Sequence, residues 1–403
     1  MPSETGTLAD YFSPRKQPGE TGLPVLSVTM NDGLVPRDSL DRRMESAMEA
    51  KAHSLVEPGD IAYNMMRMWQ GASGLCHSRA NISPAYVVMT PKANTDPAFA
   101  AHWLKSKDAV DLLWAYSHGL TEDRLRLYPD DFLSIPAVFP ALDHQRRIAS
   151  VLDTWDRAIV AADRLVKAKR ARFDWLRDEV LTGRRRLRGF NDLWRPVRLA
   201  DVLVEHGLRA TGCEEVFSVS VHKGLVNQIE HLGRSFSAKD TAHYNRVLPG
   251  DIVYTKSPTG AFPLGIIKQS KLAEEVIVSP LYGVFAPQTR DLGIFLDAYF
   301  TSPKMTERYL TPLVQKGAKN TIAVTNNQFL QGSVLVPGDE QEILALAQLA
   351  ASATAEIMAC EVELERFRHQ KRGLMQQLLT GKLRAPESVD ALLPPVPELV
   401  ADA

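Results

Sequence analysis

Three charged residues near the N-terminus have a spacing that occurs in metal-dependent nucleases. Asp41 is followed by Glu49 and Lys51, which gives a carboxylate and then a Glu-x-Lys triplet. Such a set could hold a divalent cation and orient a water molecule. The same residue types also make ordinary solvated surface segments, and the second half of the chain has no counterpart. We therefore interpret them as a surface segment and predict that the chain is not an enzyme.

Other motifs that carry catalytic chemistry are missing from the sequence. It contains no phosphate loop ending in Lys-Ser or Lys-Thr, no Gly-x-Gly-x-x-Gly, no His-Glu-x-x-His and no Gly-x-Ser-x-Gly. It also lacks the Asn/Asp-Pro-Pro-aromatic tetrapeptide of amino-methyltransferases. Cys76 and His77 adjoin each other, but a zinc site requires two further ligands. We predict no cofactor and no metal.

Residue types that read DNA bases occur in a loop of the first half, at residues 63–74. Arg and Gln side chains can bond the edges of guanine and adenine through two hydrogen bonds each. A hydrophobic core cluster of Trp69 with the neighbouring methionines is the alternative for that residue. The candidates in this loop are Asn64, Arg67, Trp69 and Gln70.

The corresponding loop of the second half, at residues 254–265, carries different candidates. They are Lys256, Ser257 and Thr259. The sequences on either side of the two loops match closely, whereas the loops themselves differ. A constant scaffold with a variable loop is a common way for one fold to read two targets.

A second pair of candidate segments precedes the last extended stretch of each half. Small polar and basic side chains on such loops suit phosphate contacts, and a solvated turn is the alternative. The candidates are Arg124 and Arg126 in the first half, and Lys316, Lys319 and Asn320 in the second.

The two halves are copies of one unit. VLSVTMNDGLV from Val25 matches VFSVSVHKGLV 191 residues later, and EPGDIAY from Glu57 matches LPGDIVY at the same offset. SPAYVVMTP from Ser83 recurs after 196 residues and FLSIPAVFP from Phe132 after 197. The matches keep their order while the offset grows by small insertions, so we infer an internal duplication.

Each copy is predicted to contain short strands and one helix. We expect strands at residues 24–28, 61–63 and 85–89 and at their counterparts in the second copy, with a Pro-Gly-Asp turn before the second strand. A helix is expected over residues 99–118 or 293–314. A last extended segment then follows Asp131 or Asn327 and ends at Pro140 or Pro337.

A long helix is predicted to follow each copy. Apolar residues alternate at spacings of three and four, which is the pattern of a coiled-coil seam. About 40 residues make a helix of roughly 60 Å, which requires a partner helix to bury its seam. Trp155 and Lys169 in the seam are candidates for setting the register, and Gly183 can cap the first helix. The predicted seam comprises Ile148, Leu152, Trp155, Ile159, Val166, Phe173, Leu176, Ile343, Leu346, Ile357, Leu364, Phe367 and Leu374.

Composition places few limits on function. The net charge is −1, so electrostatics alone would hold nucleic acid poorly, although basic residues on loops could still read it. No run of 18 apolar residues occurs, from which we expect no membrane span. Three widely spaced cysteines fit a reducing cytoplasm.

The duplicated plan resembles the specificity subunit of type I restriction–modification systems. PGDIAYNMMRMWQGASG with ISPAYVV is similar to the core of a target-recognition domain, and IPAVFPALDHQRRIASVLD and VLVPGDEQEILALAQLA are similar to the start of its long helices. The resemblance covers about residues 5–384. ALDHQ and GDEQ depart from the usual sequence at the helix start.

The resemblance implies an α+β fold of two tandem target-recognition domains, each followed by a long helix, with the helices packed as an antiparallel coiled coil. The expected segments are domain 1 (1–140), helix 1 (141–183), a linker (184–195), domain 2 (196–337), helix 2 (338–381) and a disordered acidic tail (382–403). Each domain would read one half of a bipartite, asymmetric double-stranded DNA target. The implied partners are two methyltransferase subunits and the motor–nuclease restriction subunits. A two-headed scaffold that binds protein is the alternative.

Overall fold

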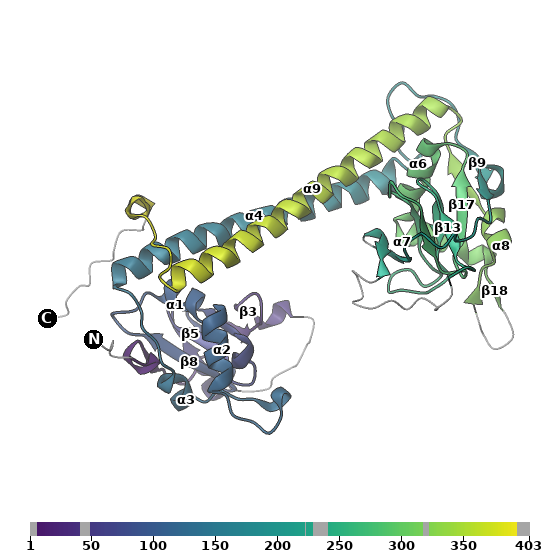
Figure 1. The fold of residues 1–403 in the computed structure, drawn as a ribbon. Helices are drawn as coiled ribbons and strands as arrows, with labels where there is room; N and C mark the ends of the chain where they lie inside the picture. Colours follow the sequence, from purple (N-terminus) through teal and green to yellow (C-terminus); the bar gives the residue numbers. More distant parts are fainter. Residues whose placement is uncertain (1–5, 41–48, 222, 229–240, 317–321, 393–403) are drawn as a thin grey trace. The chain divides into compact units, whose positions relative to one another are not determined.

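The computed structural model describes residues 6–40, 49–221, 223–228, 241–316 and 322–392, and the chain divides into two compact units. Unit 1 comprises Met1–Ala162 with Glu363–Ala403, and unit 2 comprises Asp163–Val362 (Figure 1). Both long helices, α4 (Leu142–Glu179) and α9 (Glu340–Leu379), contribute one portion to each unit. The units thus divide the chain differently from the expected segments, because each core takes in the helix portions beside it.

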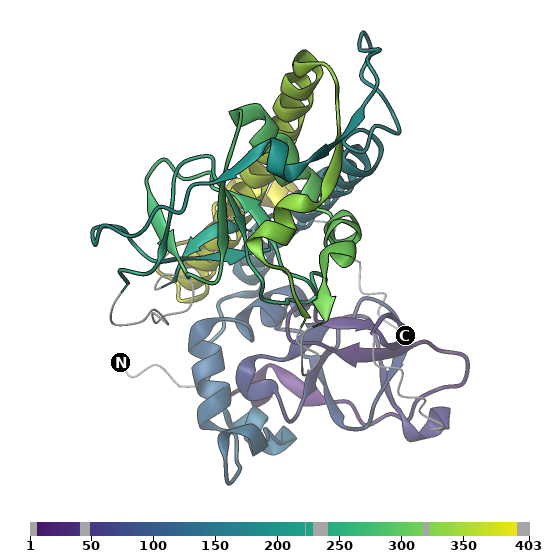
Figure 2. The same cartoon turned by 90° about the vertical axis from the view of Figure 1, so that its right-hand side faces the viewer.

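Unit 1 contains two four-stranded sheets. The first has the strand order β1-β8-β5-β6 and is antiparallel throughout. The second has the order β3-β2-β7-β4, in which β2 and β7 are parallel. In Figure 2 the helices of this unit, in blue, lie to one side of its strands, in purple. The strands are β1 (Phe12–Pro14), β2 (Val25–Val28), β3 (Leu34–Pro36), β4 (Ser54–Val56), β5 (Ile61–Asn64), β6 (Ser73–Leu75), β7 (Ala80–Ile82) and β8 (Tyr86–Pro91).

Unit 2 repeats the first sheet with its counterpart strands. The order is β10-β17-β14-β15, again antiparallel, and further two-stranded sheets pair β11 with β12, β13 with β16, β18 with β19, and β20 with β9. The strands are β9 (Arg195–Arg198), β10 (Leu203–Glu205), β11 (Phe217–Ser220), β12 (Gly224–Asn227), β13 (Asn245–Val247), β14 (Ile252–Tyr254), β15 (Ile267–Gln269), β16 (Val276–Val278), β17 (Gly283–Pro287), β18 (Gln315–Lys316), β19 (Ile322–Ala323) and β20 (Ser333–Val336).

Each copy has two short helices where the sequence predicted one helix before the last extended segment. In unit 1 they are α1 (Pro97–Trp103) and α2 (Lys107–Ala115), and in unit 2 they are α6 (Arg290–Phe300) and α7 (Pro303–Leu310). Ser106 and Ser302 cap the second helix of each pair, because each side chain accepts a backbone N–H of that helix.

The segments expected to be extended before the long helices are partly helical. In unit 1, α3 (Pro129–Ser134) includes residues 132–134 of the predicted extended stretch. In unit 2, α8 (Asn326–Gln331) precedes β20. The prediction of a wholly extended segment is therefore wrong at its start, where Phe132 and Phe329 are fully buried on these helices.

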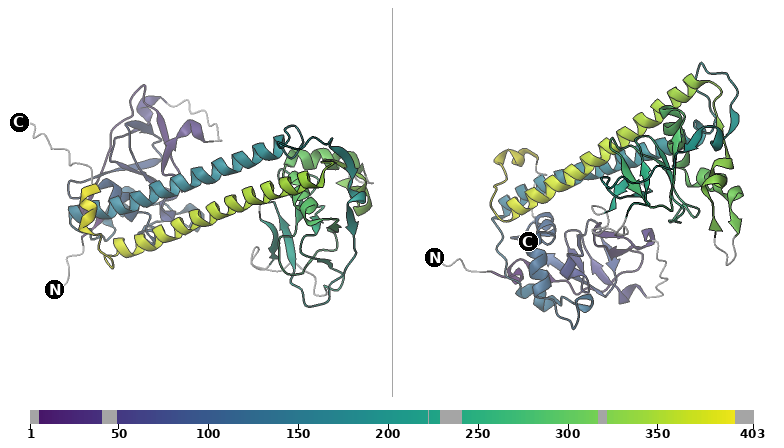
Figure 3. Two further views of the ribbon diagram at one scale, coloured as in Figure 1. Left: turned by 90° about the horizontal axis from the view of Figure 1, so that it is seen from above. Right: turned by 45° about the vertical axis from the view of Figure 1, so that its right-hand side comes forward.

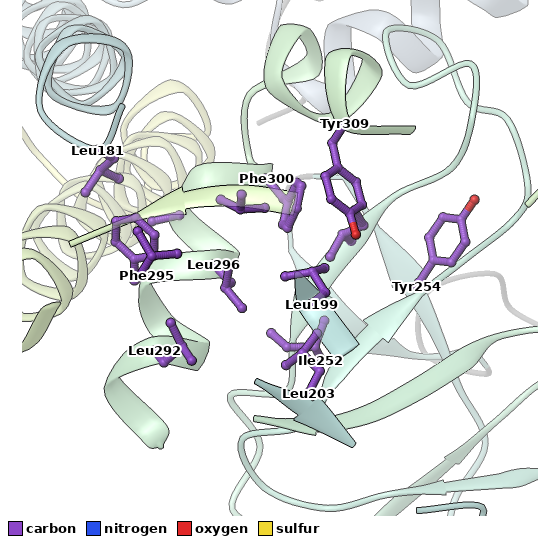
Figure 4. Close-up of a cluster of buried hydrophobic side chains, with 14 of the residues drawn as sticks. Leu181, Leu199, Leu203, Ile252, Tyr254, Leu292, Phe295, Leu296, Phe300 and Tyr309 are labelled. Carbon is purple, nitrogen blue, oxygen red and sulfur yellow. The ribbon is translucent and has the colours of Figure 1, made fainter. Parts of the chain in front are cut away.

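The core of each unit takes in both long helices. In unit 2, Leu181 after α4 and Leu346 of α9 join Tyr254, Phe295 and other buried side chains (Figure 4). In unit 1, Ile148 and Leu152 of α4 and Leu378 of α9 join the cluster around Phe12, Tyr63 and Phe132. The domains are thus fixed to the helix portions by burial of apolar surface, the dominant favourable term in folding.

Within each unit the portions of α4 and α9 lie side by side in antiparallel orientation (Figures 1 and 3). In unit 1, Trp155 meets Phe367 edge to face at 5.8 Å, and the Lys371 ammonium lies 2.5 Å from the Asp156 carboxylate. In unit 2, Lys169 pairs with Glu356 at 2.7 Å. All predicted seam residues are buried or half-buried, as a seam between the two helices requires.

The long helices end in the same way. Gly183 and Gly381 have φ angles of 73° and 72°, in the left-handed region that favours glycine. Thr182 and Thr380, one residue before, each donate a side-chain hydrogen bond to the carbonyl four residues earlier. Gly183 lies at the end of the turn that follows α4, which itself ends at Glu179.

The C-terminal segment differs from the expectation of disorder from residue 382. A 3-10 helix spans Glu387–Leu392, and Ala385 and Val389 are buried. Arg147 of α4 donates two hydrogen bonds of 2.6 Å to Asp390. The prediction is wrong for this part of the segment, because two small apolar side chains and one ion pair attach it to unit 1. Residues 393–403 lie outside the described residues.

One stretch of α9 is apolar enough to span a membrane by length and composition alone, with a mean hydropathy of 1.6 over 18 residues. A single helix of this kind is weak evidence for a membrane protein. In this stretch of α9, Leu346 and Ala350 are buried in the core of unit 2, and Glu356 is paired with Lys169 of α4.

Candidate nucleic-acid interface

The Pro-Gly-Asp turns position the strands that lead into the candidate loops. Gly59 and Gly250 have φ angles of 91° and 92°, which explains the glycine at this place. Asp60 is 1% exposed and accepts hydrogen bonds from the backbone N–H of Glu57 and from Arg15. Asp60 therefore anchors its turn. This role was not predicted from the sequence, although the repeated Pro-Gly-Asp motif signals it.

The second copy keeps this anchor with a different partner. Asp251 is 3% exposed, accepts the backbone N–H of Leu248 at 2.7 Å, and lies 2.9 Å from Nε2 of His206. Arg15 and His206 are separated by the repeat offset of 191 residues. Both copies therefore tie their first strand to the turn through a buried carboxylate.

The loop after β5 presents Arg67 and Gln70 to solvent. Both side chains are exposed, and Nη1 of Arg67 lies 3.4 Å from Oε1 of Gln70. Asn64 accepts the backbone N–H of Met66 through its side-chain oxygen, so it shapes the loop. Its side chain stands where the strand ends.

Trp69 has a partly structural role in the same loop. It is half-buried, and its indole N–H donates to the carbonyl of Met66 at 3.1 Å. Met68, which is fully buried, joins the core of unit 1 and Met65 packs against it, whereas Trp69 is not one of the residues of the cluster.

The segment with Arg124 and Arg126 adjoins the Arg67 loop. His118 and Arg126 form an isolated bridge with two backbone hydrogen bonds of 2.9 Å. The N–H of the buried Leu127 then donates to the carbonyl of Met65 at 3.0 Å. Both arginines are exposed, and within the described residues neither makes an ion pair. The structure therefore brings two of the predicted basic segments together.

The corresponding loop of unit 2 has another construction. Ser257 and Thr259 are exposed, and the backbone of Thr259 pairs with Phe262, whose side chain is buried. The hydroxyl of Tyr254 donates to the carbonyl of Leu264 at 2.9 Å and anchors the far side of the loop.

Lys256 is half-buried at the start of this loop. Burial lowers the pKa of its ammonium group, and the negative charge of Glu205 partly opposes this shift. Of the remaining candidates, Lys316 belongs to β18, whereas Lys319 and Asn320 lie outside the described residues.

The nuclease alternative gains no support from the described residues. Glu49 precedes a short 3-10 helix that contains the exposed Lys51, and Asp41 lies outside the described residues. Cys76 is buried, with its thiol 2.9 Å from the carbonyl of Ser78, and burial raises the pKa of this thiol.

A histidine and two aspartates lie close together elsewhere in unit 1. Ligand atoms of His102, Asp153 and Asp156 fall within 4.8 Å of one another. The ammonium group of Lys371 already contacts both oxygens of Asp156, at 2.5 and 2.6 Å. The cluster is best explained as an ion-pair network between α1, α4 and α9.

Comparison with solved structures identifies the fold. A structure of a type I restriction–modification system, concerned with its complex assembly and conformational transition, is 15% identical, with a TM-score of 0.53 over 94% of this chain and 97% of that one. The S subunit of a type I restriction–modification system from M. genitalium is 12% identical, with a TM-score of 0.56 over the same shares. This chain has the fold of a type I specificity subunit. No protein-family model and no curated protein matches the sequence. The α+β specificity-subunit fold, with two domains and long helices, confirms the expected architecture.

Proposed function

We propose that this chain is the DNA sequence-specificity subunit of a type I restriction–modification complex and has no catalytic activity of its own. Each of its two domains would read one half of a bipartite, asymmetric target. The observation that carries the proposal is the repeated sheet. Strands β5 and β14 hold the same place in it, yet the loops that follow them present different polar side chains.

The exposed chemistry of the loops supports DNA as the ligand. Arg67 and Gln70 are the side-chain types that bond purine edges in the major groove, and both are exposed. Arg124 and Arg126 stand on the adjoining segment, where phosphate contacts would orient the domain without reading sequence. A protein-binding scaffold would not require this combination.

The paired helices would set the unread spacer between the half-sites and bind the other subunits. An α-helix of 38 residues is about 57 Å long, so the length of α4 would translate into a defined separation of the targets. We propose two methyltransferase subunits and the restriction subunits as partners, acting in the cytoplasm. The related structure named for complex assembly of a type I system supports partners in general.

Mapping methylated bases by long-read sequencing, in the source organism with and without this gene, tests the proposal. We expect a bipartite motif with a fixed spacer to lose its methylation when the gene is deleted. Purified full-length chain should also bind duplex DNA with an affinity that falls steeply with salt, by about one unit of log–log slope per phosphate contacted. Binding that is insensitive to salt, together with unchanged methylation, would favour the protein scaffold.

A further inference from the structure

Glu205, Lys256 and Asn326 are three polar residues in one region of unit 2, near the end of β14. Glu205 is the last residue of β10, and it pairs with Phe285 of β17. Tyr254, two residues before Lys256, pairs with Gly283 of the same strand. Asn326 begins α8, and its side-chain Nδ2 donates to Oε1 of Glu205 at 2.5 Å.

Asn326 also fixes the position of this group against the sheet. A Cβ atom added at Gly283 would lie 3.0 Å from Oδ1 of Asn326, so that oxygen is close to β17. Oδ1 is buried and has no hydrogen-bond partner among the described residues. The exposed carboxylate of Glu205 keeps lone pairs for another donor, because a carboxylate has about four acceptor positions.

The first copy does not contain this polar group. Pro14 corresponds to Glu205 at an offset of 191 residues and ends β1 as Glu205 ends β10. Met65 corresponds to Lys256 at the same offset, and Pro129 begins α3 as Asn326 begins α8. Since one copy folds with apolar residues at all three positions, the scaffold does not require the polar ones.

The charges of the group suit a G·C pair better than an A·T pair, because the two acceptors of A·T are separated by its donor. In the major groove a G·C pair presents two acceptors on guanine, N7 and O6, beside one donor, the N4 amine of cytosine. An ammonium group suits the guanine acceptors, and a carboxylate accepts from the cytosine amine. Glu205 is placed near Lys256 through Asn326, which bonds Glu205 and lies beside Gly283. Gly283 in turn pairs with Tyr254, two residues before Lys256.

We infer that Lys256 and Glu205 together read one G·C pair in the DNA half-site of unit 2, with Asn326 as the residue that positions the Glu205 carboxylate. This inference rests on the proposed function and names the base pair that one of its two domains selects. The corresponding surface of unit 1 has Met65 and two prolines, so it reads no G·C pair by this means.

Selection of bound duplexes from a randomised library by the purified full-length chain, followed by sequencing, tests the inference. The wild-type chain is expected to enrich a G·C pair at one position of one half-site. Lys256→Met installs the residue of the first copy and should reduce that preference about tenfold, within the range for a lost base contact. All other positions should keep their preferences.

Glu205→Gln should relax the same position. Its carbonyl oxygen can still accept from Asn326, so the amide nitrogen replaces the free acceptor and favours a base that presents an oxygen there, such as thymine. Asn326→Ala should weaken the preference less, and Asn326→Gln, which keeps an amide donor, should restore part of it. Glu274→Gln is the matched control, because Glu274 is exposed and follows β15, whose end pairs with the start of β14.

Thermal unfolding of each variant shows whether its fold is kept. If Glu205→Gln and Lys256→Met select the wild-type motif unchanged, the inference is wrong while the proposed function stands. If the wild-type chain enriches no motif at all, the proposed function and the inference both fail.

Discussion

At the scale of single residues, Asp60 and Asp251 stabilise the scaffold, whereas Arg67 is a candidate for reading DNA. Both are almost fully buried, and each accepts a hydrogen bond from a backbone N–H of its own turn. Each also bonds a side chain that directly follows a strand, Arg15 after β1 or His206 after β10. Removing one partner of such a buried pair is costly, because the other charge is left without compensation. Arg67, by contrast, is exposed and has one long contact to Gln70, so its substitution changes the surface and leaves the core intact.

Glu214 gives a pH-dependent test at a single residue of unit 2. Burial by itself raises the pKa of this carboxyl, but hydrogen bonds from the hydroxyl and N–H of Thr211 and from the N–H of Gly212 outweigh it and lower the pKa to about 2. A folded-state pKa below the ordinary 4.5 means that the ionised form stabilises the fold. This contribution is present above pH 4.5 and is lost as the pH falls toward 2.

We therefore expect Glu214→Gln to lower the free energy of unfolding by about 1 kcal/mol at neutral pH, a typical value for hydrogen bonds to a charged group near the surface. The difference from wild type should shrink as the pH falls from about 4.5 toward about 2. Urea unfolding of the full-length chain, followed by circular dichroism at several pH values, measures it. A difference that stays constant over this range would contradict the assignment.

At the scale of elements, the long helices contribute to stability through the side chains that they bury in the core of each unit. Leu152 of α4 is fully buried in the core of unit 1, whereas Leu165 of the same helix is 49% exposed. Leu152→Ala should therefore lower the free energy of unfolding by about 2 to 5 kcal/mol, through lost burial and the cavity left behind.

Leu165→Ala is the matched control for this prediction, since it makes the same chemical change on the same helix. It should cost less than about 0.5 kcal/mol, as is usual for surface positions. Denaturant titration of both variants gives the comparison. Equal losses would show that the seam residues do not pack as described.

The helices could be predicted from the sequence because their period, length and glycine caps are all local signals. The same holds for strands that follow the Pro-Gly-Asp turns. The breaks between α1 and α2 and between α6 and α7 were missed, since they depend on the serine caps Ser106 and Ser302 inside an apolar pattern that continues across them. The attachment of residues 385–390 was missed because Arg147 and Asp390 are 243 residues apart.

The candidate site shows the same division between local and distant signals. Arg67, Gln70 and Lys256 could be found because they stand next to a repeated turn. The Glu205–Asn326 hydrogen bond joins residues 121 positions apart, and neither belongs to a repeated motif. Only the strand pairing of β10, β17 and β14 brings them to Lys256.

At the scale of the whole molecule, the proposed function together with the duplication predicts that each half-site is read independently of the other. Each domain has its own core and its own anchored loop, so a substitution in one loop should leave recognition by the other unchanged. Effects at distant sites without shared partners usually add. The independence of the half-sites therefore follows from the architecture, provided that the loops contact bases.

Arg67→Ala tests this independence together with the assignment of the first loop. We expect it to relax the preference at one position of a single half-site, at a cost of about 1 to 3 kcal/mol for the preferred base, while the other half-site and the spacer stay the same. Arg124→Ala on the adjoining segment should weaken binding to all sequences alike and reduce the salt dependence by about one phosphate, because a phosphate contact carries no sequence information. Methylation mapping with each variant gene, and titration of the purified chain with duplex DNA at several salt concentrations, measure the two effects. Unchanged methylation at every site in the Arg67→Ala strain would show that this loop does not read DNA. A changed motif in the Arg124→Ala strain would mean that the segment with Arg124 and Arg126 reads bases as well as phosphates.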